Sequence, residues 1–264
     1  MLMLDNALAR ARDALTDQLR REGFVEQARA ASRLFAGDFS EAETVGHQFG
    51  DSVLGIGVMH DILGEVVSLR GETWRVPVTG VPTPVAATDG VAFAVAAHGG
   101  RRHRLRVLPG SDLKATQLAV DDYLFRHHHD SEQVVCAIEM RGQFSDVVLR
   151  TVAPPRYEGE TLGEIIDDEA RFVFPSWTGT MVGFRFPDSS EGEVIPGLHL
   201  HGIADNRQSG GHLRSMIAEK VTTHLWIDEL HPIRDRGTGE VVTDADPIDF
   251  DRYEGPVGNL DNSD

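Results

Sequence analysis

Apolar and polar positions alternate with a period of two along most of this chain after Asp38, a pattern typical of β-strands. Pairs of turn-forming residues interrupt the alternation. Arg70–Gly71, Gly99–Gly100 and Arg141–Gly142 are each expected to fold one strand back on the next as a hairpin. The strands expected from this pattern cover 66–69, 73–76, 93–96, 104–107, 134–140, 144–152, 180–186, 198–203, 212–218 and 221–228.

Helical periodicity is confined to three segments. Apolar residues recur every three or four positions over 3–35 and predict an N-terminal helix, which Gly23 is expected to interrupt. Ser111 is a suitable N-cap for a second helix that would reach Arg126, and 161–170 would form a third. Strands dominate and helices are few. The fold class is therefore expected to be α+β, with predominantly antiparallel or mixed β-sheets.

The same pattern divides the chain of 264 residues into four parts. Residues 1–35 are expected to be a helical extension, and 36–155 an N-terminal mixed-sheet region. Residues 156–234 would form a C-terminal sheet region that contains the candidate metal ligands described below. Residues 235–264 are acidic and rich in glycine and proline, which predicts an irregular tail.

The composition narrows the range of partners. A formal net charge of −17 repels nucleic acid and anionic lipid, so neither is expected to bind. An anionic small-molecule substrate would need a local positive site, such as a metal ion or a buried arginine. The single cysteine, Cys136, cannot form an internal disulfide, and no secretory signal or membrane-spanning stretch is recognisable. These features indicate a cytoplasmic protein.

The most informative chemistry is the pair His199 and His201, followed by His212. Residues two apart on a strand point to one face, so the first two imidazoles project together, about 6.6 Å apart at Cα. The turn-rich segment 205–211 would reverse the chain and bring His212 beside them. Three neutral imidazoles with a fourth position open to water or substrate match a catalytic zinc site.

Two other interpretations remain open at this point. A His-x-His pair also occurs on solvated strand faces without any metal. The run His127–His129 is a rival cluster, but consecutive residues on a helix point in different directions, which favours an exposed helix end.

Several motifs resemble those of the bacterial acetolactate decarboxylase family, in the same order. Gly197–His201 (GLHLH) is similar to that family's GYHLH, and Ser209–Leu213 (SGGHL) to its GGHV. The two spacings between histidines agree with the family's metal triad. Weaker resemblances are found in RLFAGDF at 33–39, LGE at 63–65, LRTV at 149–152 and GTMVGFRFP at 179–187.

The resemblance implies an acetolactate decarboxylase-like fold, a homodimer and zinc-dependent decarboxylation of 2-acetolactate to acetoin. It implies that His199, His201 and His212 bind the zinc ion. It also implies catalytic roles for Arg150 and Glu65, and for Glu254 in the tail, whose Tyr-Glu-Gly context is a short match. In the reaction that the resemblance implies, zinc would stabilise the negative charge of the enolate intermediate, and Arg150 would hold the substrate carboxylate. A carboxyl group of the protein would return a proton to the intermediate.

Several positions depart from the family pattern. Val58 replaces a threonine near the family's site, His60 replaces an asparagine, and Leu198 replaces a tyrosine. Replacing a hydroxyl by an isopropyl group removes a hydrogen bond, so a related decarboxylase for a different β-keto or α-hydroxy-ketone acid is a second hypothesis. A third is a sheet domain that binds a metal or small ligand without catalysis.

Overall fold

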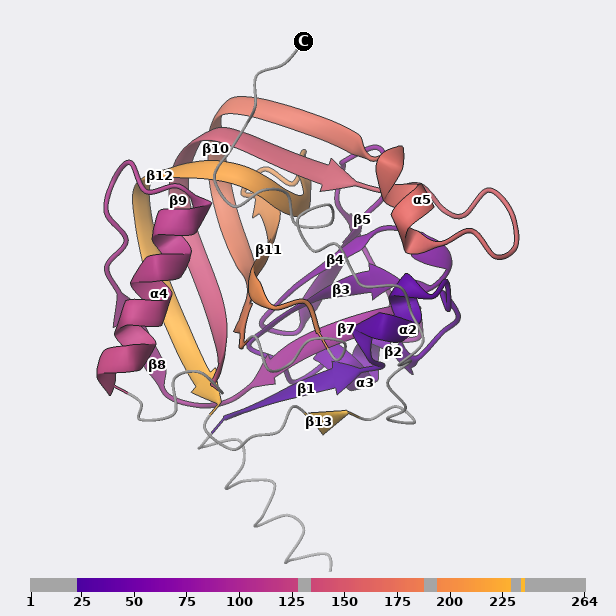
Figure 1. The fold of residues 1–264 in the computed structure, drawn as a ribbon, viewed down its shortest axis with the longest axis horizontal. Helices are drawn as coiled ribbons and strands as arrows, with labels where there is room; N and C mark the ends of the chain where they lie inside the picture. The colour runs from indigo at the N-terminus through magenta and orange to yellow at the C-terminus, as the bar shows by residue number, and fades with distance from the viewer. Residues whose placement is uncertain (1–22, 128–133, 188–193, 229–233, 236–264) are drawn as a thin grey trace, which may run out of the picture.

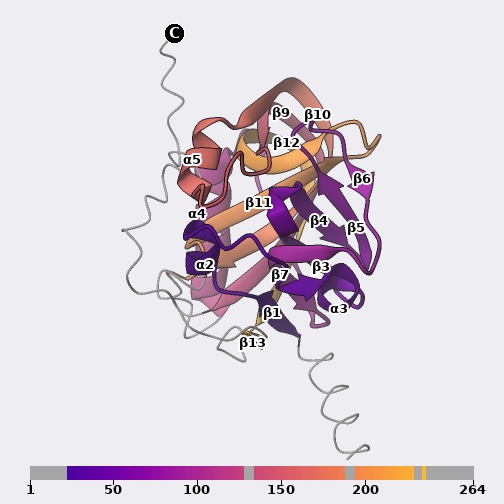
Figure 2. The same ribbon diagram turned by 90° about the vertical axis from the view of Figure 1, so that its right-hand side faces the viewer.

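The structure, a computed structural model, describes residues 23–127, 134–187, 194–228 and 234–235. The described chain forms two β-sheets that pack face to face, with short helices at their edges and one longer helix outside (Figures 1 and 2). All strand pairings among these residues are antiparallel except that of β1 with β13. The predicted α+β class with mainly antiparallel sheet is therefore confirmed.

The first sheet has the strand order β13-β1-β7-β3-β4-β5-β6, and β2 also pairs with β7. The interior strand β7 consists mostly of small and β-branched residues and is buried along its whole length, as expected of a strand covered on both faces. The strands are β1 (Phe24–Ala28), β2 (Glu43–Thr44), β3 (Leu54–Met59), β4 (Glu65–Leu69), β5 (Glu72–Val76), β6 (Thr83–Pro84), β7 (Gly90–His98) and β13 (Arg234–Asp235).

The second sheet has the order β11-β10-β9-β12-β8, and β11 also pairs with β12. Three of its strands are long: in Figure 1 they rise on the left, and β9 and β10 bend over the top of the molecule towards α5. The strands are β8 (Arg102–Leu105), β9 (Val135–Thr151), β10 (Ala170–Phe186), β11 (Gly197–Ala204) and β12 (Gly210–Asp228).

The helices lie at the edges and on the outer faces of the sheets. Asp112, not Ser111 as predicted, caps α4, because its Oδ1 accepts the Ala115 amide at 2.7 Å. Thr161 and Glu164 form a reciprocal capping box at the start of α5. The helices are α2 (Ala31–Phe35), α3 (Val45–Phe49), α4 (Leu113–His127), α5 (Leu162–Asp167) and a 3-10 turn, η1 (His60–Ile62).

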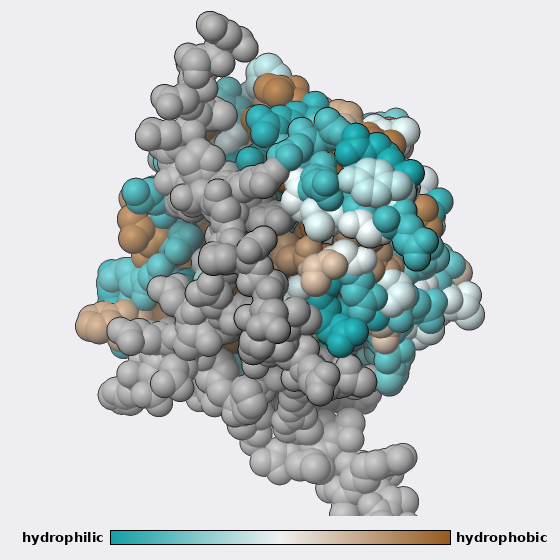
Figure 3. Space-filling view, turned by 45° about the vertical axis from the view of Figure 1, so that its right-hand side comes forward, coloured by the Kyte–Doolittle hydropathy of each residue, from teal (hydrophilic) through white to brown (hydrophobic). Residues whose placement is uncertain are grey.

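The largest apolar cluster lies between the two sheets and takes residues from both. Ile56 and Val95 of the first sheet belong to this cluster with Val182 and Phe184 of the second, together with side chains of α2 and α5. A second cluster fills the space between the five-stranded sheet and α4. The face of the molecule in Figure 3 is mostly hydrophilic where its residues are described, in keeping with the net charge of −17.

One predicted turn is wrong in a way that shapes the second sheet. Arg141–Gly142 does not end a strand: β9 runs unbroken through it and pairs with β10 and β12 on either side. Gly142 has φ +151°, and a Cβ there would lie 2.0 Å from the Lys220 carbonyl oxygen. The glycine therefore allows two strands to approach closely. The strands predicted at 212–218 and 221–228 likewise form one bulged strand, β12.

Three other expectations are corrected. Residues 24–28, within the predicted N-terminal helix, form β1 and pair with β7, while residues 1–22 lie outside the described part. Gly99–Gly100 does not close a hairpin, because β7 belongs to the first sheet and β8 to the second. The chain therefore crosses between the sheets near residue 100, and the sheets do not divide at residue 155 as expected. Within the described residues, no helix has the length and apolarity needed to cross a membrane.

Candidate metal centre and active site

Three histidines converge from two neighbouring strands. His199 and His201 project from one face of β11, because they are two residues apart. The chain then reverses, with Arg207 in the left-handed region at φ 58°, and β12 returns beside β11. In the resulting register His201 pairs directly with His212, so the third ring lies next to the first two.

The ring nitrogens are spaced as ligands of one cation would be. His199 Nε2 lies 3.2 Å from His201 Nε2 and 3.0 Å from His212 Nδ1. All three candidate ligand atoms lie within 4.8 Å of one another. Nitrogens bound to a tetrahedral zinc ion at about 2.0–2.1 Å are about 3.3 Å apart. The geometry therefore fits a divalent metal ion, although the donor set alone does not select zinc.

All three rings are buried, and His212 is held in the neutral form that metal binding requires. The histidines are only 8, 2 and 0% exposed, in sequence order. Burial lowers the pKa of His212 well below its usual value, and the nearby Arg150 guanidinium lowers it further. His201 Nδ1 lies 2.8 Å from the Val66 carbonyl, which can only accept, so Nδ1 carries the hydrogen and Nε2 presents a lone pair to the cluster.

Arg150 and Glu65 lie beside the histidines, as the resemblance implies. Arg150 on β9 pairs with His212 on β12 in the sheet register. Glu65 enters from the first strand position of β4 in the other sheet, and its Oε1 accepts a hydrogen bond from Arg150 Nη1 at 3.0 Å. Its Oε2 is 3.7 Å from His201 Nε2. Both side chains are buried, so each charge depends on the other for compensation.

These polar groups line one side of a pocket whose remaining walls are apolar. The pocket, of about 560 Å³ with its open mouth included, is bounded by the three histidines, Arg150, Glu65 and hydrophobic side chains of both sheets. A few convergent polar groups in an apolar cavity are typical of a small-molecule site. The apolar walls are formed by Ala31, Leu34, Phe35, Ile56, Gly57, Val58, Phe93, Val152, Leu162, Ile166 and Ile195.

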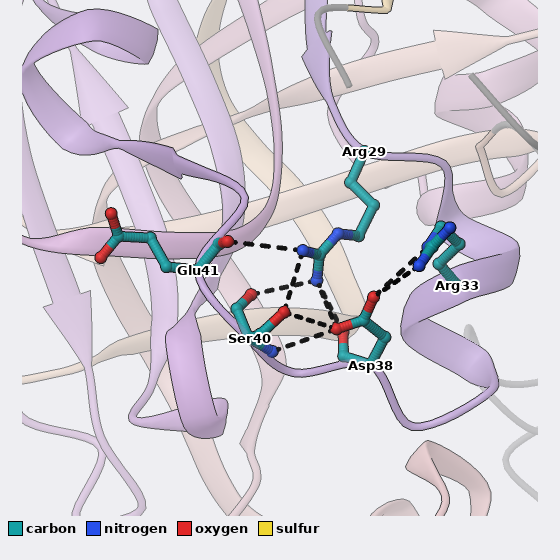
Figure 4. Close-up of polar contacts among 5 residues, drawn as sticks. All are labelled: Arg29, Arg33, Asp38, Ser40 and Glu41. Atoms are coloured by element: carbon teal, nitrogen blue, oxygen red, sulfur yellow. Dashed lines mark hydrogen bonds and ion pairs between the residues drawn. The ribbon is translucent and has the colours of Figure 1, made fainter. Parts of the chain in front are cut away.

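The short helix α2, which supplies three of these wall residues, is fixed by an arginine. Arg29 precedes α2, and its guanidinium donates to the carbonyl oxygens of Asp38 and Ser40 at 2.9 and 3.0 Å and reaches Glu41 (Figure 4). Asp38 also pairs with Arg29 and with Arg33 on α2. The loop after α2 is thereby closed around one side chain, which holds the helix against the pocket.

The remaining positions named from the sequence differ in where they lie relative to the pocket. Val58 lines the pocket, whereas His60 is one-third exposed, pairs with Asp61 and is absent from the pocket wall. His127 is at the exposed end of α4. Glu254, His128 and His129 lie outside the described residues.

Sequence reasoning missed one charged residue of this site. The Glu169 carboxylate approaches Arg150 Nε at 3.3 Å. It follows two aspartates in an acidic run that resembles an ordinary solvated surface, and no spacing or motif distinguishes it.

The fold and the site together define a class: a two-sheet protein with a buried cluster of three histidines, suited to a metal ion, on one side of an apolar pocket. Comparison with known proteins identifies the family. The alpha-acetolactate decarboxylase family profile matches residues 26–231, which is most of the chain. The chain belongs to the alpha-acetolactate decarboxylase family, a family of carboxy-lyases.

Individual relatives agree with this assignment. The chain is 31% identical over 168 residues to alpha-acetolactate decarboxylase from Methanosarcina mazei, covering 63% of this chain and 56% of that protein. It is 30% identical to the enzyme from Methylococcus capsulatus, covering 68% of this chain and 66% of that protein. The alignments thus span less than two thirds of either relative.

The fold is shared over a longer range. The crystal structure of alpha-acetolactate decarboxylase from Bacillus subtilis strain 168 superposes with a TM-score of 0.74 at 24% identity, covering 88% of this chain and 99% of that one.

Proposed function

We propose that this protein is a zinc-dependent decarboxylase that converts 2-acetolactate to acetoin. The observation that carries the proposal is the meeting of three buried imidazoles with the Arg150–Glu65 pair in one pocket of a member of this family. A metal bound by His199, His201 and His212 would supply a Lewis acid for the negative charge that remains when CO2 departs.

In this proposal Arg150 binds the anionic end of the substrate. Its guanidinium is always charged, buried and adjacent to the histidine cluster through the register with His212. It would therefore provide the local positive charge that an anionic substrate needs to enter a protein of net charge −17. The planar fork of Arg150 also fixes the orientation of a carboxylate, which determines the carbon–carbon bond that breaks.

Glu65 is placed to transfer the proton that replaces the departing CO2. When the bond to the carboxylate breaks, CO2 leaves without the bonding pair, and the remaining carbon must gain a proton. The Glu65 carboxyl faces the histidine cluster at 3.7 Å and is screened from bulk water. We propose that the Glu65 carboxylate takes up a proton from solvent through the pocket mouth, passes it to this carbon and returns to the charged form. The apolar walls exclude competing water from the intermediate.

Metal analysis combined with an acetoin assay tests the proposal. The protein loaded with zinc should bind about one ion per chain and release acetoin and CO2 from racemic acetolactate. Alanine at Arg150 or Glu65 should sharply lower turnover but leave the metal. A zinc-replete protein that does not release acetoin would refute the proposal, and retained ligand binding without any rate loss in both variants would favour a binding module.

One observation supports a related substrate as the second candidate. Val58 lines the pocket where the family resemblance leads one to expect a threonine, and Phe93 and Ile195 add apolar surface. A β-keto acid with a longer alkyl group would gain contact there and lose nothing that a hydroxyl provided. Comparing kcat/KM for acetolactate and for its homologue with one more methylene decides between the two.

The homodimer implied by the family resemblance also remains a proposal, as does a cytoplasmic location. Light scattering during gel filtration would give the mass of the particle in solution. A single peak at the mass of one chain would refute the dimer.

A further inference from the structure

Glu169 is buried against the arginine of the proposed active site. It lies between the end of α5 and the start of β10, and its side chain is 5% exposed. Its Oε2 lies 3.3 Å from Arg150 Nε. Its Oε1 lies 2.5 Å from Arg171 Nε and 3.8 Å from Arg214 Nε. A carboxylate this deeply buried stays charged only beside such cations.

The register of the second sheet explains why these groups meet. Arg150 on β9 is the cross-strand partner of Arg171 on β10 and of His212 on β12. His212 is in turn the partner of His201 on β11. Directly paired residues project from one face of a sheet, so four basic side chains form a row across four strands. Glu169 contacts the two arginines at one end of this row, and Glu65 contacts Arg150 and His201 further along it.

We propose that Glu169 is a positioning residue that holds the Arg150 guanidinium in its working orientation. The guanidinium is planar, so contacts at two of its nitrogens fix the orientation of the plane. Glu65 accepts a hydrogen bond from Nη1, whereas Glu169 forms an ion pair at the Nε edge without a hydrogen bond. Without Glu169, the guanidinium loses the ion pair at its Nε edge, and its fork is held less firmly towards the pocket. The inference rests on the proposed function, because it assumes that Arg150 binds the substrate carboxylate.

Arg171 donates a hydrogen bond to Glu169, but this contact involves a largely exposed cation. The Arg171 side chain is 60% exposed and would be solvated without any partner. Arg214 is more distant, at 3.8 Å. Only Arg150 is as deeply buried as Glu169 itself. Removing the Glu169 charge would leave the positive charges of Arg150, Arg171 and Arg214 close together without the carboxylate that now lies between them.

The test uses the full-length, metal-loaded protein with Glu169→Gln, which keeps the shape and removes the charge, and Glu169→Asp, which keeps the charge. The direct readout is the NMR signal of the Arg150 Nε–H, assigned by its loss in Arg150→Gln. We expect Glu169→Gln to shift this signal while metal content is retained, and Glu169→Asp to restore part of the shift. The exposed Glu72 supplies the control variant Glu72→Gln, which should leave the signal in place.

The kinetic readout separates positioning from a general loss of structure. We expect Glu169→Gln to lower kcat/KM for acetolactate about 10–100-fold, the range for residues that orient a functional group. In the double variant with Arg150→Gln, Glu169→Gln should cause almost no further loss, because it acts through Arg150.

An unmoved Arg150 Nε–H signal in Glu169→Gln would overturn the inference, and so would losses that multiply in the double variant. If Glu169→Gln does not fold, Glu169→Asp provides both measurements, with a smaller shift expected. If the wild-type protein does not decarboxylate acetolactate, the proposed function fails, whereas the NMR signal still decides whether Glu169 orients Arg150.

Discussion

Arg150 on β9 and His212 on β12 are direct cross-strand neighbours, so a permanently charged guanidinium lies beside a candidate metal ligand. The proximity has two consequences. It disfavours a proton on His212, whose pKa is lowered first by burial and then by Arg150. It also means that a substrate carboxylate bound by Arg150, as we propose, would lie next to the candidate metal ligands, which is the arrangement that a decarboxylation assisted by a Lewis acid needs.

Replacing His212 tests the metal centre. We expect His212→Gln to lower zinc affinity by more than about 100-fold, because two imidazoles in a three-ligand site hold the ion far less firmly than three. Zinc per chain after dialysis, measured by mass spectrometry, checks this. The control is His60→Gln, a histidine outside the pocket wall, which should retain the ion. Full zinc content in His212→Gln would rule out the triad as the binding site.

The stability of the metal-free protein should fall in acid. The pKa of His212 is lower in the folded chain than its unfolded value of 6.5, so the unfolded chain binds more protons between the two values. Full stability is present above pH 6.5 and is lost as the pH falls from there towards the folded pKa. One such group changes the free energy of unfolding by at most about 1.4 kcal/mol per pH unit. Urea unfolding from pH 7.5 to 5 measures it.

The matched variant for this pH effect is His212→Gln, again without metal. Its free energy of unfolding should depend less on pH across the same window than that of the wild type. Equal slopes in the two proteins would show that His212 does not titrate with folding.

The anchoring of α2 by Arg29 should be measurable as local stability. Arg29→Ala removes its hydrogen bonds to Asp38, Ser40 and Glu41 and leaves carbonyl oxygens without their donor. We expect a loss of about 1–3 kcal/mol, faster hydrogen exchange in Ala31–Phe35 and a raised KM, because α2 forms part of the pocket wall.

Arg33→Ala is the control for this experiment. Arg33 is one-third exposed and pairs with the same Asp38, so its loss should cost less than about 1 kcal/mol. Equal effects of the two substitutions would contradict a special role of Arg29.

The close approach of strands at Gly142 should make that position intolerant of any side chain. Gly142→Ala would place a Cβ 2.0 Å from the Lys220 carbonyl oxygen, so the strands must separate. We expect a loss of about 3 kcal/mol or more in urea unfolding. The comparison is Gly159→Ala, also at positive φ but with no atom within 4 Å, which should cost about 1 kcal/mol. A similar cost at both glycines would mean that the conformation, not the contact, is what matters at Gly142.

The elements with strong local signals were predicted correctly. The hairpin of β4 and β5 and the helices α4 and α5 follow from alternation, caps and turn residues, all of which act within a few positions. Two of the errors occur where a glycine lies against a distant segment of the chain. Gly142 and Gly99–Gly100 resemble turns in the sequence, but the neighbour that explains each of them is far along the chain.

The sequence by itself determined the metal-type triad, since His199, His201 and His212 meet through a spacing of two and one short hairpin. It also determined, through family resemblance, that Arg150 and Glu65 belong to the same site. Only the tertiary structure decided that Glu169 joins them and that helices α2 and α5 close the pocket. The physical reason is range: alternation and turns are encoded locally, whereas a buried ion pair between separate elements depends on how two sheets pack.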